Sequence, residues 1–191
     1  MTDQPSLLLL ITGAPATGKT TLGRRLAARL RFPYLYKDGF KEILFDTLGW
    51  KDRDWSRQLG KASTEMLFHV TEALLKAGLS LAMESNFHPE LDLPRLQGIV
   101  KENSCLVYQI ICTVPDAVFK ARWQARAEQG LRHPGHLDNQ LQAEFLERTP
   151  TPQEYALPLP GRVEVVDTTE LADQEFERLV EQIQAFWANP E

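Results

Sequence analysis

The chain alternates short apolar runs with longer segments in which apolar residues recur at helical spacing. The first run, Leu7–Ile11, is wholly apolar and a glycine-rich turn follows it, which is typical of a strand buried on both faces. We expect strands at 6–12, 32–36, 79–83, 105–114 and 162–166. Because helical segments separate these strands, the pattern predicts a five-stranded parallel sheet covered on both faces, a three-layer α/β sandwich.

The segments between the strands carry helical periodicity. From Lys19 to Leu30, for example, Leu22 and Leu26 fall on the same face as Leu30. We expect helices at 19–30, 39–48, 55–77, 94–102, 115–130, 137–147 and 170–188. Gly78 is a stop signal for the third helix, and Pro115 suits the first turn of the fifth.

Length and charge set limits on the class of protein. A chain of 191 residues suits one domain, 1–191, and we expect a lid segment at about 120–148, where basic residues and a Gly/Pro-punctuated stretch gather. The chain carries 26 acidic and 21 basic residues, a net charge of −5. The molecule as a whole is therefore not built to bind a polyanion.

The cysteines and the N-terminal residues indicate a cytoplasmic protein. Cys105 and Cys112 lie an odd number of residues apart in one apolar run, so we expect buried free thiols on opposite faces of a strand. Leu7–Ile11 is too short to cross a bilayer, and residues 1–6 lack the basic residues of a secretory signal. We therefore expect no membrane partner.

Residues 13–20, GAPATGKT, match the phosphate-loop pattern G-x-x-x-x-G-K-[ST] without a mismatch. The match lies between a buried strand and a helix, where backbone N–H groups and the helix N-terminus bind phosphate oxygens. There Lys19 would bridge the β- and γ-phosphates, and the Thr20 hydroxyl would ligate Mg2+. The expected nucleotide contacts are Gly13, Ala14, Pro15, Ala16, Thr17, Gly18, Lys19, Thr20, Thr21 and, from a later helix, Arg122.

A phosphate loop alone does not name the reaction. No N-K-x-D guanine-binding motif follows a later strand, and the chain is short for an AAA+ motor with its helical lid domain. We expect ATP and Mg2+, with the reaction decided by residues at the ends of the other strands.

A carboxylate follows the second expected strand. Asp38 comes 19 residues after Lys19, and the carboxyl ends of strands in an open parallel sheet line the ligand crevice. Asp38 would there orient and deprotonate an attacking hydroxyl. The alternative is that Asp38 only caps the helix expected from Gly39. Glu42 and Asp46 follow on the same helical face, and we expect them to be solvated or close to the substrate rather than catalytic.

Polar residues also follow the third expected strand, in residues 84–88, ESNFH. Glu84 occupies the place where many phosphate-loop proteins hold an acid linked to Mg2+, and the alternative is a partly exposed carboxylate at a strand end. Asn86 is expected to hydrogen-bond an acceptor. A lone loop histidine such as His88 is more often not catalytic.

Basic residues gather at 120–136 of this otherwise acidic chain. Arg122 and Arg126 are i,i+4 neighbours, so both guanidinium groups project from one helical face. Their forked donors suit the oxygens of a transferring phosphoryl group. A solvated helix face with exposed arginine ends is the alternative.

The segment that follows, residues 130–136, GLRHPGH, is punctuated by Gly and Pro. We expect it to close over ATP as a lid that excludes water, the competing acceptor, with Arg132 on the substrate. His133 and His136 have H-x-x-H spacing, but no Cys or acidic residue accompanies them in the loop, so we expect no zinc site.

Together these motifs resemble the small phosphate-loop kinases grouped with zeta toxins, chloramphenicol phosphotransferase and polynucleotide 5′-kinases. The resemblance covers nearly the whole chain. It rests on residues 13–20, on Lys37-Asp38 with Lys41-Glu42 behind them, on residues 84–87, and on Arg122, Arg126 and residues 132–136. The last element is typical of a bacterial branch classed with AAA domains.

The resemblance implies a sheet of order 2-3-1-4-5 and a mechanism that uses ATP and Mg2+. It also implies Lys19 and Thr20 on the phosphates and the metal, and Asp38 as the base for the acceptor. Arg122 and Arg126 are the lid arginines by the same comparison. Ala16 stands where many relatives have Gly, a change that is tolerable if this residue avoids positive φ.

We expect a kinase that transfers the γ-phosphoryl group of ATP to a hydroxyl of a small molecule. The expected catalytic residues are Lys19, Asp38, Arg122 and Arg126, and the expected acceptor-binding residues are Asp38, Glu84, Asn86 and Arg132. An NTP-binding switch or slow NTPase, and a toxin-like sugar-nucleotide kinase, are the alternatives. The negative net charge, with basic residues confined to the lid, argues against a long nucleic-acid substrate.

Overall fold

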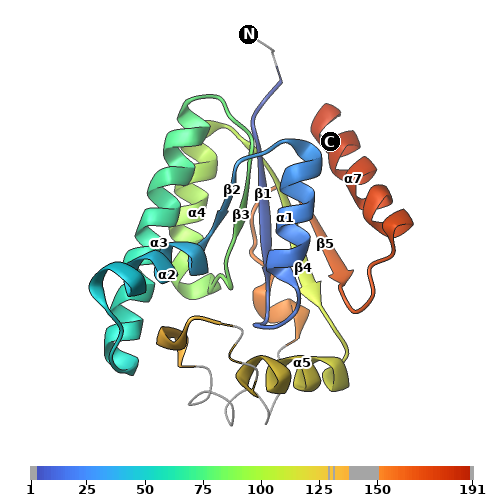
Figure 1. Ribbon diagram of the computed structural model, residues 1–191. Coiled ribbons are helices and arrows are strands. Elements are labelled where there is room, and N and C mark those ends of the chain that lie inside the picture. The colour runs from blue at the N-terminus through green and yellow to red at the C-terminus, as the bar shows by residue number, and fades with distance from the viewer. Residues whose placement is uncertain (1–3, 129, 131, 138–150, 190–191) are drawn as a thin grey trace.

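The computed structural model describes residues 4–128, 130, 132–137 and 151–189. Its centre is a parallel sheet of five strands in the order β2-β3-β1-β4-β5 (Figure 1). The strands are β1 (Leu7–Gly13), β2 (Tyr34–Tyr36), β3 (Leu81–Glu84), β4 (Leu106–Thr113) and β5 (Arg162–Asp167). The expected parallel sheet, its 2-3-1-4-5 order and its five strand positions are confirmed.

Helices cover both faces of this sheet. They are α1 (Lys19–Leu30), α2 (Lys37–Leu48), α3 (Arg53–Lys76), α4 (Pro89–Asn103), α5 (Asp116–Glu128) and α7 (Asp173–Ala188), with short 3₁₀ turns η1 (Pro134–His136) and η2 (Pro152–Tyr155). α1 and α7 lie on one face and α3 and α4 on the other, so the expected three layers are present (Figure 1). Residues 138–148, which contain all but the first residue of the helix expected at 137–147 and the last part of the expected lid, lie outside the described residues.

Three helices begin earlier than the periodicity predicts, and one of them is α3, which starts at Arg53 rather than at residue 55. α2 starts at Lys37 rather than at residue 39, directly after β2. α4 starts at Pro89 rather than at residue 94, because Pro89 fits the first helical turn and the Asp92 carboxylate accepts a hydrogen bond from the His88 N–H at 2.7 Å. The earlier start of α2 puts Asp38 inside the helix, in its first turn.

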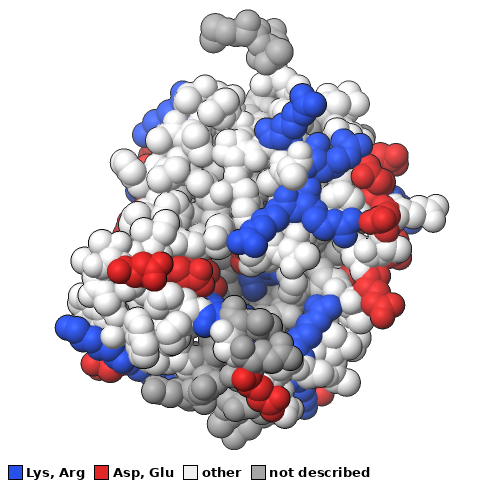
Figure 2. All heavy atoms as spheres, viewed as in Figure 1, with Lys and Arg blue, Asp and Glu red and all other residues white. Residues whose placement is uncertain are grey.

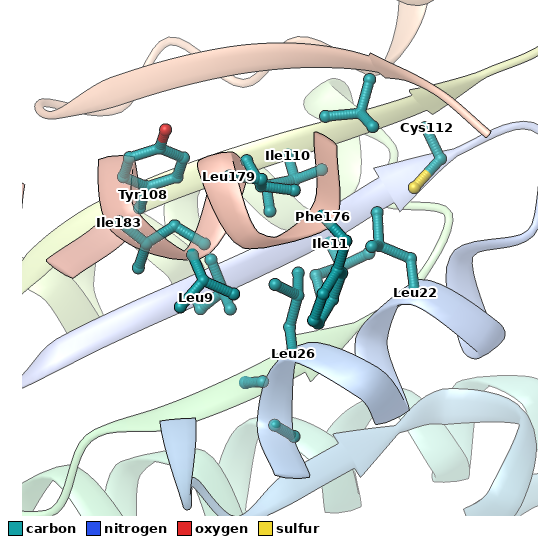
Figure 3. Close-up of a cluster of buried hydrophobic side chains, with 14 of the residues drawn as sticks. Leu9, Ile11, Leu22, Leu26, Tyr108, Ile110, Cys112, Phe176, Leu179 and Ile183 are labelled. Atoms are coloured by element: carbon teal, nitrogen blue, oxygen red, sulfur yellow. The ribbon is translucent and has the colours of Figure 1, made fainter. Parts of the chain in front are cut away.

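The central strand β1 holds the two sides of the core together. All seven of its residues are buried, as the lack of alternation predicts. Leu9 and Ile11 pack against α1 and α7 in the cluster drawn in Figure 3, whereas Leu8 and Leu10 pack against α3 and α4. A strand in this position must be apolar on both faces.

The two cysteines are free and buried, as expected. Cys112 belongs to the cluster beneath α1 and α7, and Cys105 belongs to the cluster beneath α3 and α4. Burial raises the pKa of both thiols, to about 12 for Cys112 and about 11 for Cys105. Both are therefore held as neutral thiols.

The strand register brings several chain segments to one edge of the sheet. Ile11 in β1 pairs with Glu84 at the end of β3, and Gly13 at the end of β1 pairs with Cys112 in β4. Tyr36, the last residue of β2, also pairs with Glu84. The loop after β1, the start of α2 and the polar end of β3 therefore meet at the carboxyl edge. Of the helices in the described ranges, none combines the length and apolar character needed to traverse a membrane.

Replacing Leu9 with Ala tests the role of the central strand. Leu9 is fully buried, so Leu9→Ala should lower the free energy of unfolding by about 2–5 kcal/mol. The matched control is Leu91→Ala on α4, where the leucine is 77% exposed and the expected change is within about 0.5 kcal/mol. Urea denaturation of both variants measures the difference, and equal effects would contradict the packing described here.

Candidate active site

The loop of residues 14–18 connects β1 to α1 at the carboxyl edge of the sheet. Gly13 has φ 134°, and a Cβ on this residue would lie 2.3 Å from the Cys112 carbonyl oxygen, so the close strand pairing requires glycine here. The N-terminus of α1 has no side-chain cap and no acidic residue in its first turn. Uncapped N–H groups and the positive end of the helix dipole favour an anion at this point.

Above this loop lies a cavity of about 600 Å³, a volume in the usual range for small-molecule sites. Seven of the ten expected nucleotide-binding residues line it: Pro15, Ala16, Gly18, Lys19, Thr20, Thr21 and Arg122. Gly13, Ala14 and Thr17 do not; Ala14 and Thr17 are buried on the side of the loop that faces β4 and α5. The loop therefore presents its first glycine and these two residues to the protein core rather than to the cavity.

Lys19 lies across the phosphate loop. Its side chain is buried, and its Nζ donates a hydrogen bond of 2.7 Å to the Ala14 carbonyl oxygen. Burial lowers the pKa of Lys19, and the negative charge of Glu84 opposes that effect. A buried ammonium held against the loop is suited to bind a phosphate that the loop encloses.

Ala16 adopts the left-handed conformation, with φ 62°. The condition under which alanine is tolerable here, avoidance of positive φ, is therefore not met. The loop closes on itself at this point: the Thr17 hydroxyl and the Lys19 ammonium both donate to the Ala14 carbonyl, and the Thr168 hydroxyl donates to the Thr17 carbonyl. These contacts hold the loop in a conformation that costs Ala16 backbone strain.

Glu84 forms an oxygen-rich cluster with two hydroxyl groups. Its Oε2 accepts hydrogen bonds from the Thr20 hydroxyl at 3.0 Å and the Tyr34 hydroxyl at 2.5 Å. Glu84 is buried, so the alternative of a partly exposed strand-end carboxylate is wrong. Burial raises the pKa of Tyr34, and the Glu84 charge adds to the effect, so Tyr34 stays a proton donor. Hydroxyl and carboxylate oxygens are the ligands that Mg2+ prefers, so Thr20 and Glu84 fit a magnesium site.

Asp38 lies in the first turn of α2 and lines the same cavity. The N-cap of α2 is Tyr36, so Asp38 does not cap this helix by its side chain. Its Oδ2 instead accepts from the Arg132 guanidinium in an ion pair between residues 94 positions apart. Burial alone would raise the pKa of Asp38, but the positive charges of Arg132, His136 and Lys19 outweigh it and lower the pKa to about 2.

The segment 132–136 is docked on α2 by a row of such contacts. Besides the pair between Arg132 and Asp38, the His136 Nε2 lies 3.0 Å from a Glu42 carboxylate oxygen, and the His133 Nε2 lies 3.2 Å from Asp46. The three carboxylates follow one another at i, i+4 and i+8 along one face of α2. Each meets one basic residue of the segment.

Two further contacts fix this docking. The Phe45 ring stacks on His133 at a centroid distance of 4.9 Å, and a Cβ on Gly135 would lie 2.8 Å from the same ring. The Ser56 hydroxyl on α3 donates to the Gly135 carbonyl at 2.9 Å. In the described part of the expected lid, residues 132–136 therefore rest on α2 and α3 with Arg132 at the cavity.

Arg122 and Arg126 both line the cavity from α5. The Arg122 Nη2 donates to the carbonyl oxygens of Thr168 and Thr169, each at 2.9 Å, which ties α5 to the loop after β5. The Arg126 guanidinium lies 5.3 Å from the centre of the Trp123 ring. The two arginines thus share the face that the i,i+4 spacing predicts.

The remaining expected residue, Asn86, lines the cavity after β3. Several lining residues were not among the expected catalytic or binding residues: Arg25, Lys37, Lys41, Ser85, His136 and Thr168. Three features of the sequence could have indicated some of these residues. Arg25 lies at i+4 from Thr21 on α1, and the acidic face of α2 matches the basic segment 132–136 in number of charges. Thr168 follows the fifth strand, where a loop commonly borders the nucleotide. Ser85 carries no comparable signal.

Replacing Ala16 with Gly should stabilise the protein. The left-handed conformation costs an alanine about 1–2 kcal/mol, and glycine gives back about 0.5–1 kcal/mol through its unfolded-state entropy, so a net gain of up to about 1 kcal/mol is expected. Ala28→Gly on the exposed side of α1 is the control and should destabilise by about 0.5–1 kcal/mol. Thermal unfolding compares them, and equal destabilisation by both variants would contradict the strain at Ala16.

The Asp38 ion pair should make part of the stability depend on pH. Because the pKa of Asp38 is lowered to about 2 from 3.8, its contribution is present above pH 4 and is lost as the pH falls through about 2. Asp38→Asn should therefore destabilise the protein more at pH 6 than at pH 3. Urea titrations at both pH values measure this, with Asp46→Asn on the same helix as the control. A destabilisation that is equal at the two pH values would contradict the shifted pKa.

The chain was also compared with known proteins. Residues 8–149 match the model of a family described as AAA domain. A crystal structure of a candidate kinase from Chloroflexus aurantiacus is 40% identical in sequence and superposes with a TM-score of 0.82, over 96% of this chain and 98% of that one. No match was found among curated proteins.

Two more distant structures share the fold. A sugar kinase from a Janibacter species is 20% identical with a TM-score of 0.60, over 96% of this chain and 98% of that chain. A shikimate kinase from Bacteroides thetaiotaomicron is 16% identical with a TM-score of 0.52, over 96% of this chain and 99% of that chain. The expected place among small phosphate-loop kinases is confirmed, and the chain belongs to the AAA domain family.

Proposed function

We propose that the protein is an ATP-dependent kinase that transfers the γ-phosphoryl group to a hydroxyl of a small molecule. One observation carries the proposal: Lys19 of the phosphate loop and Asp38 of α2 line a single cavity. Each of these two charges favours the charged form of the other, so they lie within electrostatic range. A phosphate at the loop and a hydroxyl at the carboxylate would meet in this cavity.

The phosphates of ATP would bind at the N-terminus of α1. Lys19 and the uncapped N–H groups of the first turn supply positive charge there. Thr20 and Glu84 would hold Mg2+, whose charge would neutralise the β- and γ-phosphate oxygens when it is bound. Tyr34 fixes one oxygen of Glu84 and so keeps that carboxylate turned toward Thr20.

Asp38 would act on the acceptor. In the transfer, the acceptor oxygen forms a bond to the γ-phosphorus, the bond from that phosphorus to the β–γ bridging oxygen breaks, and ADP leaves. The acceptor hydroxyl gives its proton to the Asp38 carboxylate. With its pKa held near 2, Asp38 is ionised across the physiological range and available as a hydrogen-bond acceptor for the hydroxyl.

Arg122 and Arg126 would stabilise charge on the transferred group. Both reach the cavity from α5, and the guanidinium fork suits the equatorial oxygens of a phosphoryl group. Arg122 already spans two carbonyl oxygens of the loop after β5, which positions its guanidinium beside Gly18 of the phosphate loop. The kinase fold of the related structures supports this assignment over a nucleotide-binding switch, which needs no base opposite the phosphate loop.

Asp38→Asn tests the proposal directly. Removal of a general base lowers rates by about 10²–10⁴-fold, so phosphoryl transfer to acceptors in a metabolite panel should fall by at least about 100-fold. Nucleotide affinity should stay within about threefold, because Asp38 is not part of the loop. Radiolabelled ATP with mass spectrometry measures transfer, and calorimetry measures binding.

Asp46→Asn is the matched control, since Asp46 lies two turns further along α2 on the same face and is 73% exposed. Phosphoryl transfer that persists in Asp38→Asn would contradict the role of Asp38 as the general base. A wild-type protein that hydrolyses ATP without phosphorylating any acceptor would instead favour the slow NTPase.

A further inference from the structure

The proposed reaction puts a proton on Asp38, and the surroundings of this carboxyl group disfavour its staying there. Seven Lys and Arg residues line the cavity against two Asp and Glu residues, although the whole chain has a net charge of −5. Basic side chains border the hollow in the face shown in Figure 2. Because the pKa of Asp38 is lowered to about 2, its carboxyl group releases a proton at neutral pH. A second group, or water, must therefore receive this proton.

A histidine lies near Asp38 in the same cavity. All four histidines of the chain are among the described residues, and of these His136 alone lines the cavity. When charged, it lowers the pKa of Asp38 more than Lys37 does, although Lys37 is the next residue to Asp38 in the chain. An imidazole changes its charge between about pH 5 and 8, so it can take up and release a proton near neutrality. His136 therefore lies within electrostatic range of Asp38 and has the chemistry to receive its proton.

Contacts with α2 hold the His136 ring in one orientation. The side chain is 3% exposed, and its Nε2 lies 3.0 Å from a Glu42 carboxylate oxygen. The ring meets the Phe45 ring edge-on, with the two centroids 5.3 Å apart and an interplanar angle of 89°. A carboxylate only accepts hydrogen bonds, so the imidazole carries a proton on Nε2, and the neutral ring keeps its lone pair on Nδ1. Glu42 would also stabilise the imidazolium that forms when Nδ1 takes up a proton.

The neighbouring His133 uses both of its ring nitrogens for docking. Its Nδ1 accepts a hydrogen bond of 3.0 Å from the Gly135 N–H, and its Nε2 lies 3.2 Å from an Asp46 carboxylate oxygen. A proton on Nδ1 would break the hydrogen bond to Gly135. His133 also does not line the cavity. It is therefore a matched control: a histidine of the same segment that contacts the same helix but is not placed to receive a proton from the site.

Charges of both signs face His136 from the elements packed around it. Asp38 and Glu42 of α2, and Glu84 after β3 across the cavity, favour the charged imidazole, whereas α3 meets the segment through the neutral Ser56. Positive charges on four elements favour the neutral ring. They are Lys37 and Lys41 on α2, Arg132 on the segment of His136, Lys19 at the phosphate loop, and Arg122 and Arg126 on α5.

We propose that His136, held by Glu42, is a positioning residue that acts through Asp38 and receives from it the proton of the acceptor hydroxyl. This inference rests on the proposed function, in which Asp38 first takes that proton. As the acceptor oxygen bonds to the γ-phosphorus, its O–H bond breaks and the proton binds the Asp38 carboxylate. The carboxyl O–H bond then breaks, the proton binds the lone pair of the His136 Nδ1 directly or through one water, and Asp38 returns to the carboxylate. The imidazolium later gives the proton to solvent.

An NMR titration tests the coupling of the two groups without catalysis. The ring signals of His136 in the full-length protein are assigned from their loss in His136→Gln, and their shift with pH gives its pKa. Removal of either carboxylate, in Glu42→Gln or in Asp38→Asn, should lower this pKa by about one unit, because a nearby opposite charge favours the charged imidazole. Asp46→Asn, which removes the carboxylate beside His133, should leave it unchanged. A His136 pKa that Asp38→Asn does not change would overturn the proposal.

The pH profile of phosphoryl transfer tests the proton step. Only a neutral His136 can take up a proton, so wild-type kcat should fall as the pH decreases through the pKa measured by NMR. The radiolabelled ATP assay measures it with the best acceptor of the metabolite panel. His136→Gln, whose amide can still donate to Glu42, should lower kcat by at least about tenfold and remove the decline, with the KM for ATP within about threefold. His133→Asn should keep the decline.

The outcomes separate this inference from the proposed function. A pH profile that is the same in His136→Gln and the wild type would overturn the role of His136 and leave the kinase and its base intact. A decline that both histidine variants lose would show that the segment acts only through its docking, and it would also overturn the proposal. Absence of transfer to any acceptor, with the coupling present by NMR, would count against the kinase itself and thereby against the proton step.

Discussion

The burial of β1 on both faces is the constraint from which the rest of the site follows. A strand of four leucines and an isoleucine can lie only at the centre of a covered parallel sheet, and its neighbours then end at the same edge. That register puts Gly13 opposite Cys112 and brings Glu84 level with Ile11. The phosphate loop, the paired oxygens of Thr20 and Glu84, and the start of α2 meet because the core requires these strands to be parallel.

An ion pair and two hydrogen bonds hold the two carboxylates of the site in place. Asp38 is held by Arg132, and Glu84 by Thr20 and Tyr34, so neither carboxylate is left unsatisfied at the cavity. A carboxylate with a pKa near 2 accepts hydrogen bonds well but is a weak base. In the proposed reaction, an Arg132 guanidinium that binds a phosphate oxygen instead of Asp38 would no longer lower the pKa of Asp38.

Local patterns were enough to predict the sheet, the phosphate loop and the side chains that project from periodic elements. Lys19, Arg122 and Arg126 were found in this way because a loop motif and an i,i+4 spacing fix where they point. The pairing of Arg132 with Asp38 joins residues 94 positions apart, and no local pattern reports such a contact. The positive φ of Ala16 was also missed, because alanine carries no signal for the left-handed conformation that glycine would have signalled.

A crystal structure of the protein with Mg2+ and AMP-PNP tests most directly whether Lys19 and Asp38 face one bound phosphate. We expect the γ-phosphate within the loop of residues 13–20, bound by Lys19, with the Asp38 carboxylate facing the same phosphorus from α2. A nucleotide bound elsewhere, or an Asp38 carboxylate turned out of the cavity with protein atoms between it and the phosphate, would contradict it.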